Sequence, residues 1–163
     1  MQTETRKTKG RTPTELRVQS TAFGDGDTVP RRYTADGENV SPALGWSEPP
    51  PHTKSIVLIC EDPDAPSGLF VHWLAWNIDP DRRELSEAVS KLSPDLVQGT
   101  NGFGDTGYGG PSPPPGTPHR YVFRVLALDY RPELPPGAKR AALDRAIEAH
   151  VLAEGKLVGK YGR

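Results

Sequence analysis

Short apolar runs, and runs in which apolar and polar residues alternate, follow one another along this chain. The run 54–62, KSIVLICED, is almost continuously apolar with β-branched residues, which predicts a buried strand. The run 69–79 is rich in aromatic and β-branched residues and predicts a second strand after a short loop. In 16–23 and 119–129, apolar side chains recur at every second position, which is typical of a half-buried strand.

A different spacing of apolar residues predicts helices in two other segments. The segment 137–155 has a stripe at i, i+3, i+4, i+7 and i+8, formed by Leu143, Ala146, Ile147, His150 and Val151. Two prolines precede it, and Gly155 is placed to end the helix. We also expect a short helix from Glu84 to Ser90 within a mixed segment that otherwise reads as loop.

Short strands in a turn-rich chain, without regularly alternating helices, predict a mainly β fold: an antiparallel β-sandwich with a few peripheral helices, including one near the C-terminus. The 17 glycines and 18 prolines make up about 21% of 163 residues, which indicates long loops but stays below the ~25–30% typical of disorder. No hydrophobic residue lies between Met1 and Leu16. We therefore predict a disordered tail over 1–15 and a single domain over 16–163.

The charge balance restricts the classes of partner. Lys and Arg total 20 and Asp and Glu total 21, so the net charge of −1 provides no field that would attract nucleic acid or an anionic membrane. There is no apolar run long enough to span a bilayer and no signal-peptide core, so we expect a cytoplasmic protein. The lone cysteine, Cys60, lies in an apolar run and is expected to be a small buried hydrophobe.

Polar residues that can carry chemistry lie at the ends of the expected strands. Asp62 and Asp64 follow the first buried strand in the proline-stiffened turn EDPDAPSG, and His72 begins the next strand. His119 and Tyr121 are two apart on a strand, so their side chains point to the same face. If these strands are neighbours, the side chains meet in one site.

The loop GYGGPSPPPGTPHRY, 107–121, predicts a rigid wall for that site. We expect Tyr108, Gly109, Gly110 and Pro111 to contact the ligand, with glycine amides that no side chain shields. Imidazoles, a phenol, exposed amides and an apolar rim suit an anion such as a phosphate monoester or a carboxylate. A carboxylate beside a histidine favours the charged imidazole.

Other interpretations of the same residues remain open. Asp62 and Asp64 equally fit a turn cap, and His72 or Tyr121 taken singly fits a core position. Two carboxylates and two histidines could bind a metal, although their spacing matches no compact motif. The chain has no nucleophile elbow, P-loop or dinucleotide fingerprint. We therefore expect no catalytic residue and no cofactor, with a hydrolase that uses the Asp–His pair as the least favoured alternative.

Four stretches, 36–50, 62–78, 107–129 and 150–163, resemble the phosphatidylethanolamine-binding proteins, in particular their bacterial Raf-kinase-inhibitor-like branch. The resemblance implies a β-sandwich with one small anion-accepting pocket at its edge. It assigns to that pocket the two aspartates of DPDAP, the histidine of HW, the glycine–proline wall, and the histidine and tyrosine of HRY. These residues are Asp62, Asp64, His72, Gly109, Gly110, Pro111, His119 and Tyr121.

The resemblance implies a non-enzymatic protein that binds a phosphate or phosphorylated head group. The alternative is a protein-interaction module that inhibits a kinase or a protease through the same pocket, and a homodimer is expected in this branch. A single His-Trp replaces the paired histidines of many eukaryotic relatives, and the chain ends at YGR without the longer animal segment. These departures argue against transferring kinase control or membrane association to this chain.

Overall fold

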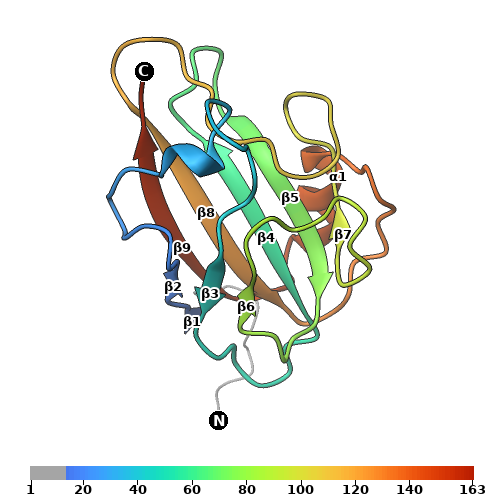
Figure 1. Ribbon diagram of the computed structural model, residues 1–163. Helices are drawn as coiled ribbons and strands as arrows, with labels where there is room; N and C mark the ends of the chain where they lie inside the picture. The colour runs from blue at the N-terminus through green and yellow to red at the C-terminus, as the bar shows by residue number, and fades with distance from the viewer. Residues whose placement is uncertain (1–13) are drawn as a thin grey trace.

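The computed structural model describes residues 14–163, so the expectations for 1–13 lie outside the described residues (Figure 1). Nine strands and one α-helix occur in this part of the chain. In chain order they are β1 (Thr14–Glu15), β2 (Val18–Gln19), β3 (Leu44–Trp46), β4 (Ser55–Asp62), β5 (Phe70–Ile78), β6 (Glu84–Leu85), β7 (Val97–Gln98), β8 (His119–Leu128), α1 (Arg140–Ile147) and β9 (Val151–Tyr161). A 3-10 turn covers Arg31–Tyr33.

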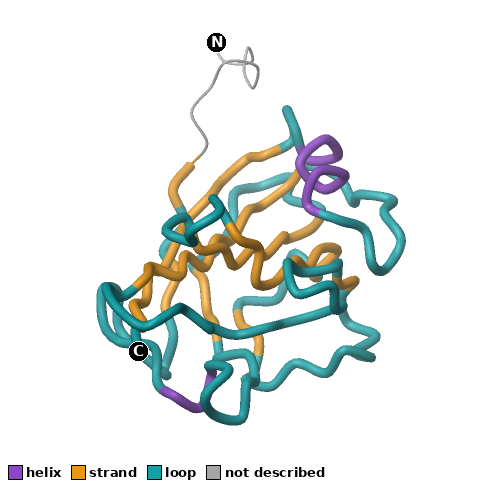
Figure 2. The backbone as a smooth tube through the Cα atoms, turned by 90° about the horizontal axis from the view of Figure 1, so that it is seen from above, coloured by secondary structure: helices purple, strands orange, loops and turns teal. Residues whose placement is uncertain are grey.

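Two sheets form the molecule. The six-stranded sheet has the order β1-β9-β8-β4-β5-β7, and the three-stranded sheet has the order β2-β3-β6. All pairings are antiparallel except that of β1 with β9. Seen from above in Figure 2, strands occupy the middle of the molecule and loops surround them. The predicted mainly β sandwich is confirmed, as are strands within 54–62, 69–79 and 119–129.

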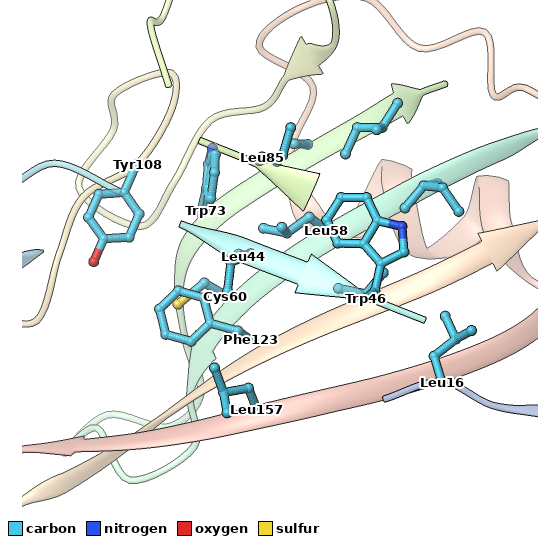
Figure 3. Packing of buried hydrophobic residues seen from close by; sticks show 14 of the residues in the cluster. Leu16, Leu44, Trp46, Leu58, Cys60, Trp73, Leu85, Tyr108, Phe123 and Leu157 are labelled. Carbon is cyan, nitrogen blue, oxygen red and sulfur yellow. The ribbon is translucent and has the colours of Figure 1, made fainter. Parts of the chain in front are cut away.

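The core has two parts, one on each face of the large sheet. Between the sheets, Leu44 and Trp46 of β3 pack with Leu58, Trp73 and Phe123 of the large sheet (Figure 3). On the opposite face, Leu143 and Ile147 of α1 pack in a second cluster. The residues of the large sheet in this cluster are Val57, Ile59, Leu74, Trp76, Leu126 and Leu128. β4 is apolar at consecutive positions because both faces of this strand are covered.

The predicted C-terminal helix is much shorter than expected. It ends at Ile147, and the remainder of the expected segment belongs to β9, the longest strand. Ala149 has a left-handed φ of 68°, which ends the helical path. Because β9 pairs with β8 from His119↔Tyr161 to Leu128↔Val151, long-range ladder bonds override the local helical pattern. Gly155 therefore lies inside a strand and does not cap a helix.

Two further expectations are wrong at the level of elements. The expected helix from Glu84 to Ser90 is absent: β6 occupies its start, and Ala88 has a left-handed φ of 60°. The expected disordered tail over 1–15 does not hold for Thr14 and Glu15, because both residues pair with β9. In addition, only Val18–Gln19 of the segment 16–23 forms a strand.

Of the helices that the structure describes, none has both the length and the apolar character needed to cross a membrane.

Candidate functional site

The candidate site lies where β4 ends and where β5 and β8 begin. β4 lies between β5 and β8 and runs antiparallel to both, so the three termini meet at one edge of the sheet, the upper end in Figure 1. Asp62 ends β4, His72 is the third residue of β5, and His119 and Tyr121 are the first and third residues of β8. The structure therefore brings together four of the five side chains that the sequence placed at strand ends.

Asp62 orients His119. One carboxylate oxygen of Asp62 accepts a hydrogen bond from Nδ1 of His119 at 2.8 Å, and the other accepts from the amide of Asp64 at 2.7 Å. The Asp62 side chain is only 4% exposed. Both carboxylate oxygens are therefore engaged in the protein, and the Nε2 atom of His119 has no partner among residues 14–163.

His72 is held by the glycine loop. Its Nδ1 atom donates to the carbonyl oxygen of Gly109 at 2.6 Å. Nδ1 therefore carries the hydrogen, and in the neutral ring Nε2 is a hydrogen-bond acceptor. The His72 ring lies among Phe70, Phe103 and Tyr121, with ring centroids 4.9, 5.6 and 5.2 Å away. Burial lowers the pKa of His72 from its ordinary value, which favours the neutral imidazole.

Tyr121 adds a hydroxyl to the same enclosure. Its ring is stacked on that of His119, with centroids 6.5 Å apart and an interplanar angle of 22°. Burial raises the pKa of Tyr121, so its phenol stays protonated and can donate. No hydrogen bond to this hydroxyl comes from the described part of the chain.

These side chains line a cavity of about 260 Å³, called the pocket below. Its volume is just under the ~300–1,000 Å³ of drug-sized ligand sites, so it suits a group of phosphate size with a few attached atoms. Aromatic and proline side chains form most of its remaining wall. The lining residues are Asp62, Ala65, Pro66, Ser67, Phe70, His72, Phe103, Ser112, Pro113, Pro114, His119 and Tyr121.

Asp64 lies outside the pocket, contrary to the prediction. Its carboxylate accepts two hydrogen bonds from the guanidinium of Arg120, at 2.9 and 2.8 Å, and one from the Arg120 amide at 2.9 Å. Hydrogen bonding by Arg120 lowers the pKa of Asp64 to about 2. Asp64 thus anchors the turn after β4 to the outer face of β8, which accords with its alternative interpretation as a structural turn residue.

Part of the glycine–proline wall also has a different role from the predicted one. Tyr108 is a core residue: its hydroxyl donates to the carbonyl of Tyr33 at 2.6 Å. The Gly109 amide donates to the carbonyl of His72 at 3.0 Å, and the Gly110 amide donates to Asn39 Oδ1 at 2.8 Å. These amides are engaged within the fold, so the expectation that they face a ligand is wrong.

Pro111, which was predicted to contact the ligand, is not among the residues that line the pocket. Its carbonyl accepts from the amide of Ala35 at 2.9 Å, which ties the wall to the neighbouring loop. The next residues, Ser112, Pro113 and Pro114, line the pocket instead. The part of the loop that contacts the pocket is therefore 112–114, directly after the wall residues that the sequence predicted.

Two aromatic residues of the pocket were missed by sequence reasoning. Phe70 precedes His72 by two on the same strand, and the alternation rule that grouped His119 with Tyr121 would also have placed Phe70 beside His72. Phe103 comes from a loop without a periodic pattern, and its contact with Phe70, at a centroid distance of 4.8 Å, depends on the tertiary fold.

The metal alternative has no further support. Among residues 14–163, no three His, Cys, Asp or Glu side chains are grouped so that they could hold a metal ion. The buried Cys60 is part of the core between the sheets, and burial raises the pKa of its thiol. Its place as a small buried hydrophobe is confirmed.

Comparisons with known proteins agree with this geometry. A family model described as phosphatidylethanolamine-binding protein matches residues 19–162. A UPF0098 protein of Methanothermobacter thermautotrophicus is 48% identical over 151 residues, which cover 91% of this chain and 99% of that protein. The UPF0098 protein YbhB of Escherichia coli is 37% identical over 157 residues, covering 90% and 99% of the two chains.

Solved structures show the same fold. The crystal structure of a phosphatidylethanolamine-binding protein homolog from Chlamydia trachomatis superposes with a TM-score of 0.84 at 35% identity, covering 92% of this chain and 99% of that one. YbcL of E. coli, described as a member of the mammalian PEBP family, gives 0.85 at 31% identity with the same coverage. The resemblance inferred from the sequence motifs is confirmed. The chain belongs to the phosphatidylethanolamine-binding protein family, in the branch of its bacterial and archaeal UPF0098 relatives.

Proposed function

We propose that this protein binds a small anion, a phosphate monoester or another phosphorylated group, in the pocket and does not chemically transform it. The observation that carries the proposal is the convergence of His119, His72 and Tyr121 on one cavity, each with a polar atom that has no partner among the described residues. Asp62 supports this role because it fixes the His119 ring by its Nδ1 atom. The remaining Nε2 atom is then available to a ligand.

The electrostatics of the pocket predict how binding varies with pH. The lowered pKa of His72 favours a neutral ring near pH 7, and its Nε2 then accepts a hydrogen bond instead of donating one. Below its ordinary pKa of 6.5 the ring becomes increasingly protonated and turns into a second cationic donor. Phosphate affinity should therefore rise as the pH falls below 6.5 towards about 5.5.

The chemistry of the site supports binding over catalysis. Cys60 is buried in the core, and Ser112 Oγ accepts a hydrogen bond from Arg163 at 3.4 Å instead of pairing with a histidine. Ser67 lines the pocket without a base bonded to its hydroxyl among residues 14–163. Nucleophilic catalysis requires such a base or a lowered pKa. Turnover of phosphomonoesters that is lost in His119→Ala would contradict the binding role.

Calorimetric titration with inorganic phosphate and O-phosphorylethanolamine tests the proposal. His119→Ala should weaken binding severely, because it removes a pocket donor and leaves the buried Asp62 without its partner. His150→Ala is a matched control: His150 also pairs with an aspartate, Asp129, at 2.8 Å, but lies outside the pocket. Equal affinities for the two variants, or no binding by the parent protein at millimolar ligand, would refute the proposal.

The second candidate function, a protein-interaction module that inhibits a kinase or a protease, draws on the surface beside the pocket. Leu69 is 53% exposed and Phe103, which lines the pocket, is 48% exposed. A phosphorylated side chain in the pocket would bring neighbouring peptide residues against this apolar surface. A phosphopeptide that binds more tightly than free phosphate, by a margin lost in Leu69→Ser, would favour this function. A homodimer and a cytoplasmic location stay predictions.

A further inference from the structure

A second hollow adjoins the pocket on the opposite side of β8. It has a volume of about 580 Å³, and its lining includes Asp64, Pro114, Thr117, His119, Arg120 and Lys160. We call it the outer groove. His119 and Pro114 line both the outer groove and the pocket, so the two hollows share part of a wall.

The alternation of β8 explains this arrangement. His119 and Tyr121 point inward and are buried, whereas Arg120 between them is exposed on the outer face. Arg120 lies directly opposite Lys160 of β9, so the two cationic side chains share that face. Two hydrogen bonds hold the backbone of Lys160. Its amide donates to the carbonyl oxygen of Asp27 at 2.9 Å, and its carbonyl oxygen accepts from the amide of Val29 at 2.8 Å.

The outer groove has two cationic side chains, Arg120 and Lys160, and only Arg120 has an acidic partner among residues 14–163. Arg120 is neutralised by Asp64, which binds its guanidinium with both carboxylate oxygens. Lys160 has no ion pair within residues 14–163. An ammonium group is thus exposed in a groove whose rear wall is the histidine of the pocket.

We propose that the outer groove is a second anion subsite, and that the ligand class is a phosphate monoester carrying a second anionic group. This inference rests on the proposed function: the phosphate occupies the pocket, the chain passes His119 and Pro114, and the second anionic group contacts Lys160. The pocket, at about 260 Å³, holds little beyond the phosphate, so the remainder of a larger ligand must lie outside it. The outer groove provides that place, because it shares a wall with the pocket and its Lys160 has no acidic partner among residues 14–163.

Calorimetric titration with a series of alkane α,ω-bisphosphates of increasing chain length, each paired with its alkyl monophosphate, tests this subsite. Bisphosphates long enough to pass His119 should bind roughly three- to tenfold more tightly than their monophosphates, which is the statistical factor of two for two equivalent phosphates multiplied by the factor expected of one exposed ion pair. Lys160→Ala should reduce this gain to the statistical factor of about two and leave monophosphate affinity unchanged, and Lys160→Arg should retain most of the gain. Lys156→Ala is the control, since Lys156 lies on the same face of β9 but does not line the outer groove.

The outcomes separate this inference from the proposed function. Monophosphates that bind while no bisphosphate exceeds them by more than about twofold, or a larger bisphosphate gain that survives Lys160→Ala, would overturn the subsite and leave the pocket intact. Equal weakening of both ligand classes by Lys160→Ala would also overturn it, because the lysine would then act only through its long-range field. No binding by either class would overturn the subsite together with the pocket.

Discussion

The side chains of the pocket show how far residue chemistry follows from spacing. The strand rule of i, i+2 correctly grouped His119 with Tyr121, and the same rule applied to β5 gives Phe70 with His72. The prediction that a proline-stiffened turn aims both carboxylates at one site failed for Asp64, because Asp62 is the last residue of β4 and Asp64 lies in the turn beyond it. Its partner Arg120 is 56 residues away and could not be predicted from local spacing.

The amides of Gly109 and Gly110 show a second limit of predicting a residue's role from the sequence. The absence of a side chain at Gly109 and Gly110 predicted accessible amides, but a side chain at Gly110 would clash with the carbonyl oxygen of Tyr33. These glycines allow the loop to pack closely against its neighbours, which is a second physical reason for glycine in a loop. Sequence alone does not distinguish close packing from ligand access.

Burial of His72 should make the stability of the fold depend on pH. The pKa of His72 is lowered in the folded state, so its stabilising contribution is complete above its ordinary value of 6.5 and is lost as the pH falls from there towards the folded value. His72→Asn retains a donor to Gly109 but does not titrate. Between pH 7 and 5 the wild type should lose more unfolding free energy than the variant, by up to about 1.4 kcal/mol per unit of pKa lowering.

Urea unfolding of both proteins at the two pH values measures this difference. Other ionisable groups contribute equally to the two proteins, so their effects cancel in the comparison. Identical pH dependence for wild type and His72→Asn would show that His72 titrates in the folded protein as it does in the unfolded chain.

Strands and helices were predicted with unequal success for a physical reason. β4, β5 and β8 carry strong local signals, being apolar, aromatic or alternating over eight to ten residues. β9 has no such signal, because its first residues continue the helical stripe of α1, and only its ladder with β8 makes it a strand. Short strands such as β6 depend equally on a partner that is distant in sequence.

The substitution Gly155→Ala tests why glycine occurs at this position: the structure indicates close strand packing and not a helix cap. A Cβ atom there would clash with the carbonyl oxygen of Leu16, where the chain leaves β1. Gly155→Ala should therefore cost about 1–3 kcal/mol of unfolding free energy, the usual range for overpacking. Gly45→Ala in β3 is the matched control, since its added Cβ would meet its nearest neighbour at an ordinary 3.5 Å. Urea unfolding that gives equal free energies for the two variants would contradict this explanation.

The end of the chain holds the proline wall of the pocket. The guanidinium of Arg163 donates to Asp36 at 2.7 and 3.1 Å and to the carbonyl of Pro113 at 3.0 Å. Tyr161 also donates to Asp36, at 2.6 Å. Hydrogen bonds from Arg163 and Tyr161 lower the pKa of Asp36 to about 2, so this contact persists at neutral and mildly acidic pH. Ser112 and Pro113 line the pocket, and their position therefore depends on Arg163.

Arg163→Ala should weaken phosphate binding several-fold while lowering the unfolding midpoint only modestly, because the Arg163 and Asp36 side chains lie at the surface, 33% and 23% exposed, where solvent screens the ion pair. Arg163→Lys should fall between the two, since lysine keeps the charge but not the fork that binds Asp36 and Pro113 together. Arg17→Ala is a control of equal size and charge change, remote from the pocket. Calorimetry and thermal unfolding measure the two effects, and unchanged affinity in Arg163→Ala would show that the wall is held without it.

At the scale of the whole molecule, the sandwich concentrates its chemistry at one end. The three-stranded sheet covers one face of β4 and α1 covers the other, and this rigid centre fixes the ends of β4, β5 and β8 that position the pocket. The turn-rich composition and short strands correctly predicted this class of fold. The strand order could not be predicted from periodicity, because it places β8 and β9 beside strands that are distant in sequence.

The most direct test of the central claim is a map of backbone amide chemical shifts during titration with inorganic phosphate, repeated on His119→Ala. We predict shifts confined to the end of β4, the start of β5, the loop 101–118 and the start of β8, all lost in the variant. Shifts elsewhere, or none at millimolar phosphate, would contradict the claim that this pocket binds anions and would leave its buried His–Asp pair with a structural role alone.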